Sequence, residues 1–213
     1  GCICADGTAL IPMVITPRKQ ISRKLESYGY NDQNCMIVGQ ESGFINAQLF
    51  DHWAITVLFP EIERRRILFK YKGEALIMLD GCTSHFSDVF LDECSYNNVY
   101  PFQEPAGSSD QVQALDLGIF SVQKLHKKHF KPPRSIKNDS EKEIMAIVDS
   151  WRHATTPRNV VSAFNQAGIY RNVVNDEVVM AANIKYARAV RGMAHEDPPD
   201  CVLYERNRKI PVF

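Results

Sequence analysis

The segment LIMLDGCTSH, Leu76–His85, decides the fold, because an apolar run leads directly into an aspartate. Residues 75–79 form a short, continuous apolar run, which is typical of a strand buried on both faces of a sheet. In open α/β sheets, ligands bind near the carboxyl ends of the strands. Asp80 stands at such an end, where its carboxylate could hold a hard cation such as Mg²⁺. The alternative is that the Asp80 side chain only caps the turn that follows.

The segments around this strand alternate between extended and helical patterns. Asp6-Gly7 predicts a hairpin turn between two extended segments. Asn46 predicts the cap of a helix, which Pro60 is expected to end. The alternating order predicts an α/β fold with a mixed sheet flanked by helices. The predicted strands are residues 9–15, 36–38, 75–79 and 99–102, and the predicted helices are residues 46–60, 86–93 and 116–131.

A double proline, Pro132-Pro133, marks the predicted boundary between a core, residues 1–133, and a helical extension, residues 134–213. Capping signals, apolar spacing and a stop glycine predict the helices of the extension. The chain after residue 194 is expected to be a loop with a short terminal strand. The predicted helices of the extension begin at the capping box Ser140–Glu143, at Thr156, and near Asn175, the last one ending near Ala194.

Composition limits the possible classes of protein. The 213 residues carry 25 basic and 25 acidic side chains, so no overall positive charge indicates nucleic-acid binding, although a local basic face is compatible with this balance. No apolar run is long enough to span a membrane, and no signal peptide is visible. The six cysteines form no C-x-x-C pair, which suits a reducing compartment.

A second acidic motif follows about 30 residues after the first. In SSDQVQALDLGIF, Ser108–Phe120, Asp116 opens an amphipathic helix. On its own, an acid at this place is explained by favourable charge at a helix N-terminus. The two acids lie one helix and one strand apart, however, so a sheet with helices on its faces could bring them together.

Four motifs, in the same order, resemble the nuclease domain of DDE transposases of the pogo/Tigger/jerky branch of the mariner superfamily, which includes centromere protein B. In that family a hydrophobic strand ends in Asp-Gly-x-x-Ser-His, and a later motif reads Gln-Pro-Leu-Asp-x-Gly-x-Phe. The matching segments here are DGCTSH at residues 80–85, QALDLGIF at residues 113–120, ADGTALIP at residues 5–12 and SAFNQAGI at residues 162–169.

The resemblance implies a ribonuclease-H-like (integrase-like) mixed sheet flanked by helices and followed by a helical segment. It implies that Asp80 and Asp116 hold two Mg²⁺ or Mn²⁺ ions for phosphodiester hydrolysis and DNA strand transfer. His85 and Asp110 would lie next to these acids. The implied partner is DNA, bound by a homodimer or a higher transposase assembly in the nucleus, with no membrane association.

The family's first strand, which carries its first catalytic acid, has no match within this sequence, and neither has its N-terminal helix-turn-helix. Both are expected ahead of Gly1, so the chain is predicted to be an incomplete nuclease core without activity of its own. Two residues also depart from the motif. Asp110 stands where the family often has His, and Ala114 replaces the usual Pro.

A basic run near the end of the third predicted helix is the best candidate for phosphate contacts. Cations in this place add a salt-dependent and sequence-independent contribution to DNA binding. They would equally suit a solvated helix end, where positive charge favours the carbonyl dipole. The residues are Lys124, Lys127, Lys128, Lys131 and Arg134.

Three further interpretations stay open beside a transposase catalytic domain. A transposase-derived DNA-binding protein without catalysis would not need Asp80 and Asp116, and a decayed element would have no selected activity. A metal-dependent phosphatase or nuclease of another α/β fold would need a further acid or histidine at a strand end. The sequence patterns point to no such residue.

Overall fold

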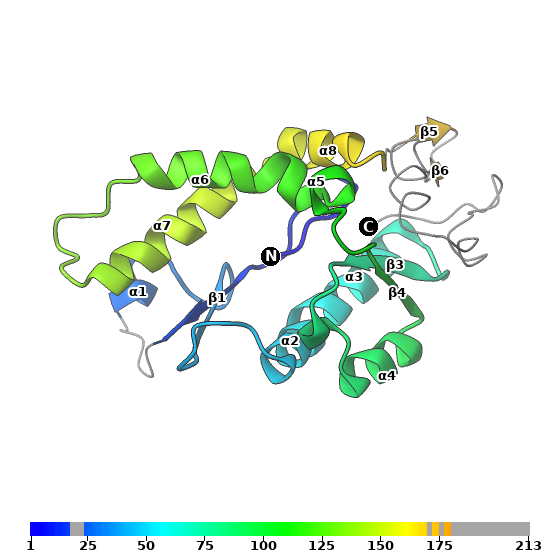
Figure 1. Cartoon of the computed structure of the whole chain (residues 1–213), viewed down its shortest axis with the longest axis horizontal. Helices are drawn as coiled ribbons and strands as arrows, with labels where there is room; N and C mark the ends of the chain where they lie inside the picture. Colours follow the sequence, from blue (N-terminus) through cyan, green and yellow to red (C-terminus); the bar gives the residue numbers. More distant parts are fainter. Residues whose placement is uncertain (18–23, 170–171, 175–176, 180–213) are drawn as a thin grey trace.

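The computed structural model of the chain describes residues 1–17, 24–169, 172–174 and 177–179. Their strands form pairs rather than one wide sheet (Figure 1). Two pairs are parallel and one is antiparallel. The parallel pairs are β1 (Met13–Thr16) with β2 (Met36–Gly39) and β3 (Ala75–Leu79) with β4 (Val99–Gln103), and the antiparallel pair is β5 (Asn172–Val174) with β6 (Glu177–Val179).

Helices account for most of the remaining described chain and lie on both sides of β3 and β4 (Figure 1). The mixed α/β class predicted from the sequence is therefore confirmed. The helices are α1 (Lys24–Ser27), α2 (Ala47–Trp53), η1 (Ala54–Leu58), α3 (Phe59–Phe69), η2 (Thr83–His85), α4 (Asp88–Tyr96), α5 (Ser109–Val112), η3 (Leu115–Ile119), α6 (Phe120–His129), α7 (Asp139–Ala154) and α8 (Pro157–Gln166).

Strand β3 is covered on both faces, as its continuous apolar sequence predicts. Ala75, Ile77 and Leu79 point to a core formed with α2, η1, α3 and α4. Leu76 and Met78 point the other way and pack against the buried Val112 of α5. Alternate residues of a strand face opposite sides, so a strand covered twice needs apolar residues throughout.

The pair β1–β2 belongs to a second core. Val14 of β1 is buried with Leu25 of α1 and with Ile144, Met145 and Val148 of α7. Helix α7 in turn lies along α6 (Figure 1), and the two helices make many residue contacts. The predicted boundary between residues 133 and 134 separates these two packed helices, and it stays a prediction.

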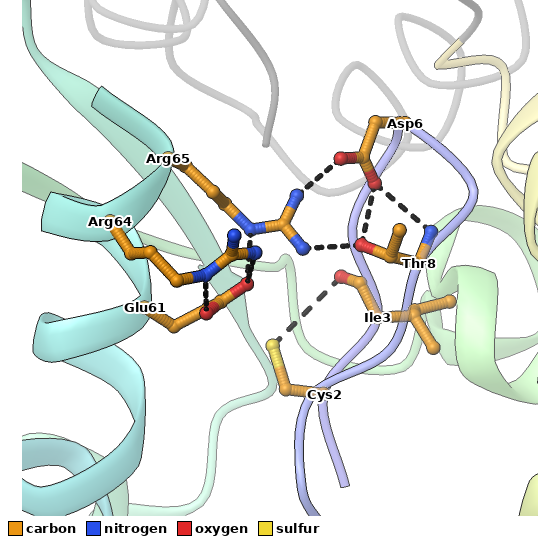
Figure 2. Close-up of polar contacts among 7 residues, drawn as sticks. All are labelled: Cys2, Ile3, Asp6, Thr8, Glu61, Arg64 and Arg65. Carbon is orange, nitrogen blue, oxygen red and sulfur yellow. Dashed lines mark hydrogen bonds and ion pairs between the residues drawn. The ribbon is translucent and has the colours of Figure 1, made fainter. Parts of the chain in front are cut away.

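An N-terminal hairpin is held against α3 by one buried arginine. The Cys4 N–H donates to Thr8 O across the turn, and Gly7 adopts a φ of 97°, which confirms the turn predicted from Asp6-Gly7. Arg65 of α3, only 3% exposed, binds the carboxylate of Asp6 and also Thr8 (Figure 2). On its own helix, Arg65 Nε donates to Glu61 Oε1 at 2.8 Å. Arg65 thus has a structural role, since its guanidinium donates to Asp6, Thr8 and Glu61.

The expectation that Pro60 ends a helix is wrong, although the predicted cap at Asn46 is confirmed. The helix continues from α2 through η1 into α3, and Pro60 lies in the first turn of α3. The preceding turn is π-helical, with the Phe59 N–H bonded to Ala54 O. A proline in the first turn needs no N–H donor, so this irregular turn lets the chain remain helical.

Two expectations for the C-terminal helices also need correction. Asn138, not Ser140, caps α7, and its side chain accepts a hydrogen bond from the Ser140 N–H at 3.0 Å. The start of α8 at Thr156 and Pro157 is confirmed. The predicted helix over residues 175–194 is wrong at Glu177–Val179, which pair as β6 with β5. The rest of that helix, and the terminal strand, lie outside the described residues.

Within the part of the chain that the structure describes, we find no helix with the length and apolar character needed to cross a membrane.

Candidate active site

Strands β3 and β4 end side by side, and each is followed at once by an acidic residue. Their parallel register pairs Leu79 with Gln103. The Glu104 N–H then donates to Leu79 O at 2.7 Å, which extends the ladder by one residue. Asp80 and Glu104 therefore occupy equivalent positions on neighbouring strands, where parallel strands lie about 4.8 Å apart. Backbone hydrogen bonds thus hold the two acidic residues side by side at this edge.

Asp80 combines the two roles that its sequence context suggests. Its Oδ1 accepts a hydrogen bond from the Cys82 N–H at 3.1 Å, which is the predicted turn cap. The same Oδ1 lies 2.8 Å from Nδ1 of His85, although Nδ1 has no well-aligned hydrogen bond. Among the described residues, no donor reaches Oδ2, and 43% of the side chain is exposed. Asp80 can thus cap the turn and still offer an oxygen to a ligand.

His85 packs inward beside Asp80. Its ring centroid lies 4.4 Å from that of the buried Phe50, so its environment is largely apolar. Burial lowers the pKa of His85, and the charge of Asp80 opposes this shift only in part. The imidazole is therefore neutral at pH 7. His85 thus lies beside Asp80 without neutralising its charge.

Glu104 is the residue that sequence reasoning missed. Its side chain is buried, with 6% exposure, and Oε2 has no hydrogen-bond partner in the described chain. Burial, together with the charges of Asp80 and Asp116, raises the pKa of Glu104 to about 7. Glu104 lines the same cavity as Asp80.

A signal for Glu104 was present in the sequence. Like Asp80, it follows directly after a short apolar strand, VYPFQ at residues 99–103. Pro101 lowered the expectation for that strand, because proline cannot donate to a ladder. In the structure Pro101 is nevertheless paired, opposite Ile77 of β3. The expectation that no further acid stands at a strand end is wrong.

Asp116 reaches this neighbourhood from a different element. It lies in the π-helical η3, which continues into α6. A Cβ atom added at Gly118 would come within 2.6 Å of the Ala163 Cβ, so η3 lies very close to α8. Asp116 itself is exposed, on a turn whose backbone this close packing holds. Single π-turns of this kind occur often at functional sites.

Cysteine and histidine add a further set of ligand atoms beside Asp80. One potential ligand atom from each of Asp80, Cys82 and His85 lies within 4.8 Å of the others.

Asp110, in the first turn of α5, is exposed. No hydrogen bond or ion pair joins Asp110 to the other acids in the described chain, so its predicted place beside them stays a prediction.

The acidic residues meet the chemical requirements of a divalent cation. In the described chain, no lysine or arginine forms an ion pair with Asp80, Glu104 or Asp116. Hard cations such as Mg²⁺ and Mn²⁺ prefer carboxylate oxygens. An unpartnered, buried carboxylate oxygen next to two more acids is the donor set that such an ion would use. Asp80 and Glu104, at the ends of neighbouring strands, are candidate ligands for such an ion, with Asp116 on η3 as a third candidate.

The predicted basic residues lie on α6 and on the segment that follows it. Lys127 binds the carboxylate of Glu143 on α7. The other four cations are exposed, and we find no carboxylate partner for them among the described residues. These four are Lys124, Lys128, Lys131 and Arg134.

Comparison with known proteins identifies the family of the chain. Residues 1–164 match the sequence profile of the DDE superfamily endonuclease family. A human relative, "Pogo transposable element with ZNF domain", is 27% identical over 128 residues, which are 59% of this chain and 8% of that protein. No solved structure matches the chain. Because the family profile covers most of the sequence, including both predicted acidic motifs, the chain belongs to the DDE superfamily endonuclease family.

Proposed function

We propose that the chain is part of the catalytic domain of a DDE transposase that hydrolyses phosphodiester bonds and transfers DNA strands in the nucleus. The observation that carries this proposal is the acidic edge formed by Asp80 and Glu104, with Asp116 on η3, because no lysine or arginine of the described chain pairs with these acids. Asp80 and Asp116 would hold Mg²⁺ or Mn²⁺. When bound, two such ions stabilise the attacking and the leaving oxygen of an in-line displacement.

The residues of this chain would contribute position rather than proton transfer. Asp80 is fixed by the end of β3 and by the Cys82 N–H, and Asp116 by the close contact of η3 with α8. Rigid placement is what a charge-stabilising site requires, because the ligands then need no reorganisation during the reaction. Neutral His85 would orient Asp80, and Asp110 would lie at the rim.

We further infer that the two parallel strand pairs belong to one ribonuclease-H-like sheet, with the family's first strand between them. A cavity of about 340 Å³ supports this arrangement. Residues of the N-terminal hairpin line it on one side, and all of β3 lines it on the other. A strand placed there would bring the first acid of the family to the edge that carries Asp80.

A cleavage assay tests the proposed reaction. The 213-residue chain alone, in Mn²⁺ with labelled duplex DNA, is expected to be inactive. A longer protein that includes the sequence upstream of Gly1 is expected to cut the DNA, and Asp80→Ala or Asp116→Ala should abolish the cleavage. Asp92→Ala, on the exposed side of α4, is the matched control and should leave it unchanged. Cleavage that survives both substitutions would refute the assignment of these acids.

One observation favours DNA binding even without catalysis. The exposed cations of α6 and the following segment have no internal partner in the described chain, so they are available to phosphates. A transposase-derived DNA-binding protein would retain this surface while tolerating the loss of Asp80 or Asp116. DNA affinity unaffected by either substitution, together with absent cleavage in the longer protein, would support that second function.

A further inference from the structure

Glu104 is held as firmly as Asp80, and toward the same edge. Its N–H continues the β3–β4 ladder, and the turn after it is closed by Ser108, which is fully buried and donates its hydroxyl to Pro105 O at 2.6 Å. The residues around Glu104 thus leave its backbone little freedom. The side chain lines the same cavity as Asp80 and His85. Its direction is therefore set by the fold, not by a flexible loop.

A purely structural role does not explain this side chain. Burying a carboxyl group without a partner for one of its oxygens costs free energy, whether the group is ionised or neutral. An apolar residue of similar size would fill the space at lower cost. Where this chain uses a partly buried acid for structure, as at Asp6, it supplies an arginine. Glu104 has no such partner among the described residues, and the neighbouring strand ends at another acid, Asp80.

We infer that Glu104 is a third carboxylate ligand of the metal site, so that this chain carries its own acidic triad, Asp80, Glu104 and Asp116. This inference rests on the proposed metal-dependent function and adds a ligand to it. Three carboxylates with an unpartnered oxygen form a site for a hard divalent cation of the Mg²⁺ or Mn²⁺ class. The triad would bind such an ion without the acid expected upstream of Gly1.

The test is direct binding of Mn²⁺ to the 213-residue chain, measured by calorimetry and by the electron paramagnetic resonance signal of the free ion. Glu104→Gln keeps the shape of the side chain and removes its charge, so binding should weaken by about tenfold or more. Glu74→Gln, at the exposed opposite end of β3, is the matched control and should bind like the parent chain. Thermal unfolding in EDTA verifies that each variant is folded.

Glu104→Asp is a second variant in case Glu104→Gln does not fold. It keeps the carboxylate but withdraws it by one methylene, so Mn²⁺ binding should again weaken. Unchanged binding in a folded Glu104 variant would overturn the inference, and so would the absence of saturable binding to the parent chain.

The variants also separate this inference from the proposed function. If Asp80→Asn loses Mn²⁺ and Glu104→Gln keeps it, the proposed metal site stands and the role of Glu104 is refuted. If neither substitution changes binding, the metal site of the proposed function fails as well. The cleavage assay with the longer protein remains an independent measure of the reaction itself.

Discussion

Two acidic regions of this molecule are built in opposite ways. At the N-terminal hairpin, Asp6 and Glu61 both bind Arg65, which lies buried between them (Figure 2). At the ends of β3 and β4, Asp80 and Glu104 lie next to each other, and no lysine or arginine of the described chain pairs with either. The first region is neutralised from within the chain. The second keeps its negative charge at a cost to stability.

The difference shows how a structural carboxylate can be told from one placed for a ligand. Arg65 gives Asp6 and Glu61 a fixed role, since separating them would leave charges buried and unpaired. Asp80 and Glu104 repel each other, and this repulsion is relieved only by a proton or by a bound cation. Unfavourable electrostatics held in place by a rigid sheet is typical of functional sites.

The largest expected effect comes from breaking the neutralised region. Arg65→Met should lower the free energy of unfolding by about 3 kcal/mol or more, because Asp6 and Glu61 would both lose the buried arginine that they bind. Urea denaturation measures the change. Arg64→Met is the control and should have little effect, because Arg64 is largely exposed where it binds Glu61. Equal losses of unfolding free energy in the two variants would show that burial of Arg65 adds no stability to its ion pairs.

The next largest effect is on the pH dependence of stability, which should reflect the unpaired Glu104. Because the pKa of Glu104 is raised to about 7 in the folded chain, the folded state holds this proton more tightly than the unfolded state. Stability from this group is present below about pH 4.5 and is lost as the pH rises to about 7. In EDTA, the free energy of unfolding of Glu104→Gln should therefore fall by roughly 1 to 3 kcal/mol less than that of the parent chain over this pH range. Urea denaturation at a series of pH values measures it, and parallel curves for parent and variant would contradict the prediction.

A smaller effect tests whether Asp80 and Glu104 influence each other. Asp80→Asn removes one of the negative charges that raise the pKa of Glu104, so that pKa should fall toward its ordinary value. The Glu104 carboxyl carbon can be followed by NMR in labelled protein without metal. Asp92→Asn, remote on α4, is the control. If Glu104 titrates identically in both variants, the charge of Asp80 does not influence Glu104.

The smallest effect extends the contrast between paired and unpaired charges to α6. Lys128 has no acidic partner in the described chain, whereas Lys127 binds Glu143. Lys128→Gln should weaken DNA binding and reduce the slope of log affinity against log salt by about 1. Lys127→Gln should change the slope less, because its charge is already partly neutralised. Fluorescence anisotropy over a range of salt concentrations measures both, and a larger change for Lys127 would reverse the interpretation.

Local sequence signals located much of the fold. The apolar run before Asp80 predicted the buried β3, Asp6-Gly7 predicted the hairpin, and Thr156-Pro157 predicted the start of α8. Each of these features depends on neighbouring residues, through turn geometry, capping or periodic burial. Pro60 misled for the same reason, since the π-helical turn that accommodates it forms within a longer packed helix.

The acidic site was likewise predicted only in part from local sequence. The sequence by itself determined that Asp80 ends a strand and that Asp116 begins a helical segment, because both follow from local pattern and from motifs resembling those of DDE transposases. Only the tertiary structure decided that Glu104 joins them. Its significance depends on the register of β4 against β3, on burial and on the absence of a nearby cation in the described chain. Register and charge environment arise from contacts between distant segments, which no local pattern encodes.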